Sequence, residues 1–173
     1  MLRFDAARDG LLLIDLQANM MPAIREGDGV VARARFLARA ARLLGVPVVA
    51  TEQNPSRLGT TVEDLLVEKA APKMAFSAAA WAPDVPGVVL LVGVETHICV
   101  AQTGLDLLAG GREVAVVTDA TGSRTEDRHL SGLERLRAAG AVLAHSEAVL
   151  YEWLETAEHP RFREALALVK EDS

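Results

Sequence analysis

Cys99 is the only cysteine of this 173-residue chain, and its thiol is a candidate nucleophile. It follows the apolar run 90–94 after a short link, and the residues beyond it have a helical pattern. A cysteine at the start of a helix directly after a strand meets unpaired backbone N–H groups and the helix dipole, which stabilise a thiolate. The same N–H groups can bind the oxyanion that forms when sulfur attacks a carbonyl carbon. The position is typical of an acyl-transfer nucleophile, but a small buried apolar side chain is the commoner explanation for a lone cysteine, so the position alone does not decide between them.

Asp15 and Lys73 are two further candidates, and each alone has a common structural explanation. Asp15 ends an apolar run, and such surroundings suit a carboxylate that accepts a proton from a thiol. A carboxylate at a strand end is also a frequent turn or helix cap. Lys73 lies in the otherwise apolar segment 72–76, where an ammonium ion is costly unless a carboxylate is near. An exposed lysine is the commoner case, so neither residue alone indicates an active site.

The elements that must position these side chains follow a βαβ pattern, because short apolar runs alternate with longer amphipathic stretches. The predicted strands are 11–15, 47–52, 88–92, 113–118 and 141–144. The predicted helices are 28–44, 99–108, 125–139, 147–155 and 160–170. Strands that are apolar on both faces indicate a parallel sheet covered by helices, which binds ligands at the carboxyl ends of its strands. The irregular stretch 53–86 is expected to hold loops over that edge.

The composition is that of a globular protein, with 50% hydrophobic and 24% charged residues. A net charge of -6 makes nucleic acid an unexpected partner, because phosphate binding depends on clustered Lys and Arg. The longest apolar run, 85–94, is interrupted by proline and glycine and is too short to span a bilayer. One cysteine cannot form an intrachain disulfide, and a free thiol suits a reducing compartment. We therefore expect one cytoplasmic domain over residues 1–173, with no membrane partner.

Taken together, these residues resemble the isochorismatase-like cysteine hydrolases. The most specific matches are the segments 13–17 and 92–100, and the order and spacing of Asp15, Lys73 and Cys99 agree with the catalytic trio of that family. Further matches are 51–55, then Lys73 with Phe76 and Ser77, and finally 118–120, of which the first is similar to a small-protein branch of the superfamily. The resemblance covers nearly the whole chain.

The resemblance implies a three-layer, Rossmann-like α/β fold with a central six-stranded parallel sheet and helices on both faces. It also implies a cis peptide bond between Val94 and Glu95. In this family Asp15 would take the proton of Cys99, and the thiolate would attack an amide carbonyl to form a thioester that water then hydrolyses. Lys73 would hold Asp15 ionised and oriented. The backbone N–H groups of Glu95 and Cys99 would bind the oxyanion.

Four further side chains are predicted to contact the substrate. We expect the polar side chains of Gln17 and Asn19 to line the pocket. Phe76 and Trp81 are expected to form an apolar wall, with a role in the hydrophobic core as the alternative. No cofactor and no metal ion are expected, and the substrate is expected to be a small amide-type molecule.

The histidines limit the substrate class that the resemblance implies. Nicotinamidases of this superfamily bind a metal through an Asp-x-His pair and a later His, all before the catalytic lysine. The histidines of this chain all follow Lys73 in the sequence: His97, His129, His145 and His159. Nicotinamide is therefore not the expected substrate. True isochorismatases cleave a vinyl ether without the cysteine, so Cys99 argues against that reaction and leaves N-carbamoyl amides and other small amides open.

Two functions of other classes remain open from the sequence. The chain is either a hydrolase or a non-catalytic, scaffolding member of the same fold. A thiol redox sensor is the third hypothesis, although no second cysteine is present to resolve a sulfenic acid. A Cys99–His97 dyad is not favoured, because residues two apart at a helix start do not face each other. The family resemblance also implies a homo-oligomer, either a dimer or a larger assembly.

Overall fold

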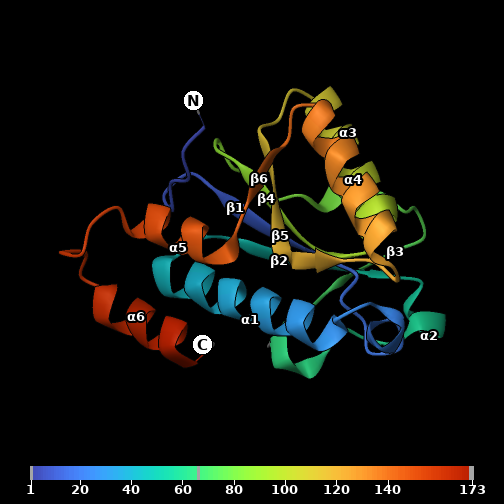
Figure 1. Cartoon of the computed structure of the whole chain (residues 1–173), viewed down its shortest axis with the longest axis horizontal. Helices are drawn as coiled ribbons and strands as arrows, with labels where there is room; N and C mark the ends of the chain where they lie inside the picture. The colour runs from blue at the N-terminus through green and yellow to red at the C-terminus, as the bar shows by residue number, and fades with distance from the viewer. Residues whose placement is uncertain (1, 66, 172–173) are drawn as a thin grey trace.

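A six-stranded parallel sheet forms the centre of the computed structural model, which describes residues 2–65 and 67–171 (Figure 1). The strands are β1 (Gly10–Ile14), β2 (Val48–Gln53), β3 (Ala71–Lys73), β4 (Val89–Val94), β5 (Val114–Gly122) and β6 (Val142–Ala144). Their spatial order is β3-β2-β1-β4-β5-β6, with parallel pairing between neighbours. The predicted three-layer α/β fold is confirmed.

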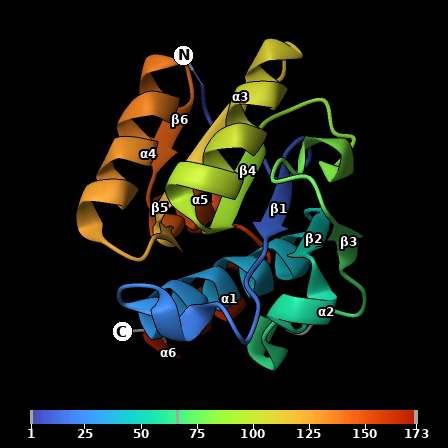
Figure 2. The same cartoon turned by 90° about the vertical axis from the view of Figure 1, so that its right-hand side faces the viewer.

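Helices cover both faces of the sheet (Figure 2). The elements of one face are α1 (Gly27–Leu44), α5 (Ser146–Leu154) and α6 (Phe162–Glu171), and those of the other are α3 (Ala101–Ala109) and α4 (Glu126–Ala138). Short helical segments are α2 (Pro55–Leu58), the 3-10 turns at Met21–Ala23, Glu63–Leu65 and Ala79–Trp81, and a π-helical turn at Thr96–Val100. Every residue of β1 is buried, because alternate side chains pack into the two helical layers.

Two local features differ from the sequence-based prediction. The edge strand β3 lies within the stretch 53–86, where the sequence predicts loops and none of the predicted strands lies. It has three residues, one of them Pro72, so it carries no apolar alternation that sequence reasoning can detect. The helix predicted to begin at Cys99 is preceded by the π-helical turn, and Cys99 lies inside that turn. Single π-helical turns are often found at functional sites.

The strand order reverses at β1, which lies between β2 and β4. At such a point the connecting helices leave to opposite faces, and a crevice opens at the carboxyl ends of the two central strands. Asp15 directly follows β1, and Cys99 follows β4. The topology therefore brings the candidate base and the candidate nucleophile to the same crevice.

Gly93 allows β4 to approach β1 closely at this crevice. It is paired with Ile14, the last residue of β1. Its φ of +128° is rarely adopted by residues with a side chain, and a Cβ atom there would lie 2.0 Å from the carbonyl oxygen of Ile14. Glycine at this position therefore sets the separation between the strand ends that carry Asp15 and Cys99.

We predict that Gly93→Ala lowers the free energy of unfolding by at least about 3 kcal/mol, since it adds both backbone strain and a backbone clash. Urea unfolding followed by circular dichroism measures this loss. Gly29→Ala is the matched control, because nothing lies within 4 Å of a Cβ atom at this helical position. It should stabilise the protein by about 0.5–1 kcal/mol. Equal effects of the two substitutions would contradict the role given to Gly93.

Candidate active site

Lys73 and Asp15 form an ion pair whose side chains have no exposed surface, with 2.6 Å between Nζ and Oδ2. Lys73 reaches the site because it is the last residue of β3. Its ammonium group also donates to Oε1 of Gln53 at 2.8 Å and to the carbonyl oxygens of Ala75 and Phe76 at 3.2 and 3.0 Å. Four acceptors surround a group with three protons, which stabilises the charged ammonium in a buried place.

Asp15 is fixed by the end of the neighbouring strand as well as by Lys73. Its backbone has a φ of 54°, in the left-handed region, and its N–H donates to the carbonyl oxygen of Thr51 at 3.1 Å. The hydroxyl of Thr51 donates to Oδ1 of Asp15 at 2.9 Å. Each carboxylate oxygen therefore has a protein donor, and the carboxylate is held in one orientation.

The Cys99 thiol lies against this pair and is buried, with 4% of the residue exposed. The pKa of Cys99 is raised to about 12, and burial is the largest cause. The negative charge of Asp15 and a hydrogen bond from the thiol to its carboxylate contribute to this rise, while the charge of Lys73 opposes it. Cys99 is therefore a thiol at neutral pH, whereas the sequence pattern predicted a stabilised thiolate. The difference arises because the α3–α4 layer covers the turn and a carboxylate lies beside it.

Thr103 connects the segment after Lys73 to the turn that carries Cys99. Its hydroxyl, which has no exposed surface, donates to the carbonyl oxygen of Cys99 at 2.6 Å and accepts from the N–H of Ala78 at 2.8 Å. These two hydrogen bonds hold the segment after β3 and the π-helical turn in one position relative to each other.

The peptide bond between Val94 and Glu95 is cis, as the family resemblance implied. The Glu95 carboxylate accepts from the backbone N–H and from Nε of Arg124, at 3.0 and 3.1 Å. Nδ1 of His97 lies 3.0 Å from the hydroxyl of Ser123. The side chains of Glu95 and His97 thus bind the loop after β5, and the groups that act on the thiol pKa are Asp15, Lys73 and Glu95.

The predicted substrate contacts lie at different depths. Gln17 is buried, and its amide bonds to backbone groups: Oε1 accepts from the N–H of Gln53 at 2.8 Å, and Nε2 donates to the carbonyl oxygens of Gln53 and Gly59 at 3.1 and 2.6 Å. Asn19 is exposed, Phe76 is 53% exposed, and Trp81 is half-buried. Of these, the structure brings Phe76 to the ion pair through its carbonyl oxygen.

Thr51 and Gln53 are site residues to which the sequence analysis assigned no role, although both lie in the matched segment 51–55. Both belong to the carboxyl end of β2, beside the end of β1. A signal was present, because the apolar run of β2 ends in the polar residues Thr-Glu-Gln at the ligand-binding edge of the sheet. Their contacts with Asp15 and Lys73 depend on pairing between distant segments, which the local pattern does not contain.

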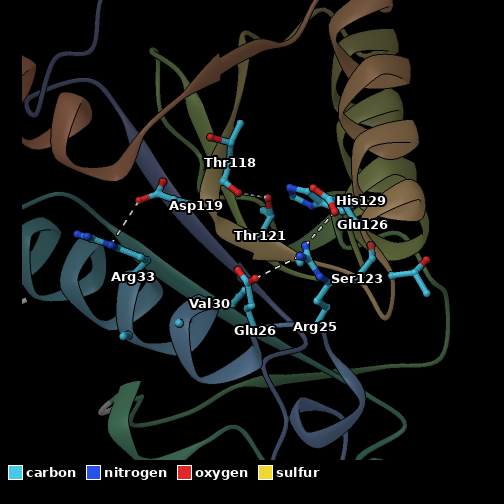
Figure 3. Close-up of a pocket in the computed structure, with 14 residues that line it drawn as sticks. Arg25, Glu26, Val30, Arg33, Thr118, Asp119, Thr121, Ser123, Glu126 and His129 are labelled. Atoms are coloured by element: carbon cyan, nitrogen blue, oxygen red, sulfur yellow. Dashed lines mark hydrogen bonds and ion pairs between the residues drawn. The ribbon is translucent and has the colours of Figure 1, made fainter.

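A cavity of about 430 Å³ lies at the carboxyl end of β5, between the N-terminal turns of α1 and α4 (Figure 3). Its charged side chains are paired within the wall: Arg25 with Glu26 and Glu126, each at 3.4 Å, and Arg33 with Asp119 at 3.8 Å. None of the three candidate catalytic residues lines it. The cavity is therefore separate from the site at Cys99.

Within residues 2–65 and 67–171, no group of three or more His, Cys, Asp or Glu side chains is placed to hold a metal ion. In the same part of the chain, no helix is long and apolar enough to cross a membrane.

The site and fold match a known family. The sequence model of the isochorismatase domain matches residues 9–148. The chain belongs to the isochorismatase family. It is 40% identical over 166 residues to isochorismatase domain-containing protein 1 of Danio rerio, covering 90% of this chain and 59% of that protein. It is also 40% identical over 169 residues to isochorismatase domain-containing protein 2A of Mus musculus, covering 93% and 82%.

Solved structures of isochorismatase-like fold resemble this chain over nearly its full length. The MAR1 ribonuclease of Caenorhabditis elegans superposes with a TM-score of 0.90 at 34% identity, covering 97% of this chain and 92% of that one. The ycaC gene product of Escherichia coli, described as an octameric hydrolase of unknown specificity, has a TM-score of 0.83 at 23% identity, covering 100% and 98%. The likeness to the Escherichia coli protein concerns the fold alone.

Proposed function

We propose that this isochorismatase-family chain is a cysteine hydrolase that cleaves the C–N bond of a small amide through a thioester on Cys99. The observation that carries the proposal is the buried series in which the thiol of Cys99 donates to Asp15 and Asp15 is paired with Lys73. A carboxylate that accepts a hydrogen bond from a thiol is placed to take its proton. The nucleophile, its base and the cation are all side chains, so the proposed reaction needs no cofactor.

The proposed reaction has two steps. Sγ of Cys99 attacks the amide carbonyl carbon while its proton passes to Asp15, and the backbone N–H groups of Glu95 and Cys99 donate to the oxyanion. Asp15 then gives the proton to the departing nitrogen, the C–N bond breaks, and an acyl thioester remains. In the second step Asp15 takes a proton from water, the resulting hydroxide attacks the thioester, and the C–S bond breaks. The departing Sγ takes back the proton that Asp15 holds, which restores the thiol and the carboxylate. Lys73 stays charged throughout and keeps Asp15 ionised between the steps.

The proposed substrate is small and partly apolar. Phe76 and Trp81 would contact its apolar part and Asn19 its polar part, with N-carbamoyl compounds and simple amides as the two classes to test. The amide of Gln17, which is bonded to backbone groups, would support the pocket wall from behind. We also propose a homo-oligomer, since exposed Met74 (71%) and Phe76 (53%) lie beside the site. A reducing compartment such as the cytoplasm would keep Cys99 reduced.

Three alternatives are less well supported. A redox-sensing thiol is exposed and ionised, whereas Cys99 is buried and has a raised pKa. The Caenorhabditis elegans neighbour is named a ribonuclease, but this chain has a net charge of -6, which disfavours a polyanionic substrate. A scaffolding role would not require the buried Asp15–Lys73 pair, because such pairs are weak sources of stability.

The test is a panel of small amides and N-carbamoyl compounds, assayed for ammonia release with the intact protein and with Cys99→Ala. We expect release from at least one compound and a loss of at least about a thousandfold in Cys99→Ala, because no other side chain replaces the nucleophile. The melting temperature of the variant should stay close to that of the parent, which separates lost chemistry from lost folding. Equal ammonia release by Cys99→Ala would contradict the proposal.

A further inference from the structure

We infer that Gln53 is a positioning residue that orients Lys73 toward Asp15, an inference that rests on the proposed function. Gln53 ends β2 and is 8% exposed. Its Oε1 accepts a hydrogen bond from Nζ of Lys73 at 2.8 Å, while the same ammonium group donates to Asp15 at 2.6 Å. The ammonium group of Lys73 therefore donates to the side chain of Gln53 as well as to the proposed base, Asp15.

A neutral acceptor suits this place better than a charged one. Lys73 and Asp15 carry opposite charges, so the pair is neutral as a unit. The amide oxygen of Gln53 satisfies one ammonium proton without adding a charge, which leaves Asp15 as the anionic partner of Lys73. A carboxylate in its place would compete for the ammonium group and would make both the ionised Asp15 and a thiolate at Cys99 less favourable.

Gln53 is itself held in one orientation by contacts on its other side. Its Nε2 donates to the carbonyl oxygen of Met74 at 2.9 Å, and its backbone N–H and carbonyl bond to the amide of Gln17 at 2.8 and 3.1 Å. A flipped amide would turn its Nε2 donor toward the ammonium of Lys73 and its oxygen toward a carbonyl. The buried Gln17 in turn donates to the carbonyl oxygen of Gly59 at 2.6 Å. The loops after β1 and β2 therefore support the orientation of Lys73.

The experiment measures how fast iodoacetamide alkylates Cys99 at a fixed, mildly alkaline pH, with the modified protein counted by intact mass spectrometry. Cys99 is the only cysteine, so the signal needs no substrate. The ionisable groups whose charge acts on its thiol are Asp15, Lys73 and Glu95. In Gln53→Glu, the added charge beside Lys73 should raise the thiol pKa by about one unit and slow alkylation about tenfold.

Gln102→Glu is the matched control, because it adds the same charge to an exposed side chain of α3, one helical turn beyond Cys99. Solvent screens that charge, so alkylation should stay within about twofold of the parent rate. Alkylation of Gln53→Glu within about twofold of the parent, or equal slowing in Gln102→Glu, would overturn the inference.

A second variant, Gln53→Met, keeps the length of the side chain and removes the acceptor. We expect kcat for an amide of the panel to fall at least about tenfold while KM changes by less than about threefold, because the loss affects Lys73 and not the bound substrate. Unchanged kcat in a folded Gln53→Met would also overturn the inference. If this variant does not fold, the alkylation rates of Gln53→Glu and Gln102→Glu decide. Failure of the proposed function would appear separately, as ammonia release by Cys99→Ala.

Discussion

Lys73→Met is expected to lower the free energy of unfolding by about 3–5 kcal/mol at neutral pH, because it leaves the Asp15 carboxylate buried without its cation. The two side chains have no exposed surface, so water cannot replace the lost partner. Hydrolysis should fall at least about a hundredfold, since Asp15 loses the group that keeps it ionised and oriented.

Urea unfolding of the parent and of Lys73→Met at neutral pH measures this loss of stability. Lys69→Met is the matched control, because Lys69 is exposed and its loss should change stability by less than about 0.5 kcal/mol. A double variant, Asp15→Asn with Lys73→Met, should recover part of the stability, since it removes the unpaired charge. A loss below about 1 kcal/mol in Lys73→Met at neutral pH would mean that the pair does not form as described.

The fold could be predicted from the sequence because its strands are buried on both faces. The runs that became β1 and β4 are apolar without interruption by charge. Asp15 follows β1 directly, and Cys99 follows β4 after a short link. The expectation that both residues meet at the carboxyl edge of a parallel sheet required no information beyond this pattern and the connection rules of such sheets.

The remainder of the site depends on contacts between distant segments. The edge strand that ends in Lys73 is too short for its pattern to be visible, and the shared hydrogen bonds of Gln53 join three loops. The protonation state of Cys99 also could not be predicted without the structure. A local pattern reports the helix start after the strand, but the raised pKa comes from packing of the α3–α4 layer and from Asp15.

Asp15→Asn is expected to slow the acylation of Cys99 at least about a hundredfold at neutral pH, because the thiol loses the base that accepts its proton. Two effects of Asp15 act in opposite directions here. Its charge raises the pKa of Cys99, so its removal alone would favour the thiolate and speed the reaction. As a base, however, it removes the proton during attack, and burial, the largest cause of the raised thiol pKa, remains in the variant and keeps the thiol protonated.

Whether Asp15→Asn slows or speeds the acylation of Cys99 tests the proposed chemistry most directly. The measurement is the first-turnover release of p-nitrophenolate from p-nitrophenyl acetate by the intact protein and by Asp15→Asn, with Cys99→Ala subtracted as background. If Asp15 is the base for Cys99, release by Asp15→Asn is at least about a hundredfold slower at neutral pH and becomes faster as the pH rises. Release by Asp15→Asn as fast as that of the parent, or faster, would contradict the assignment of Asp15 as the base.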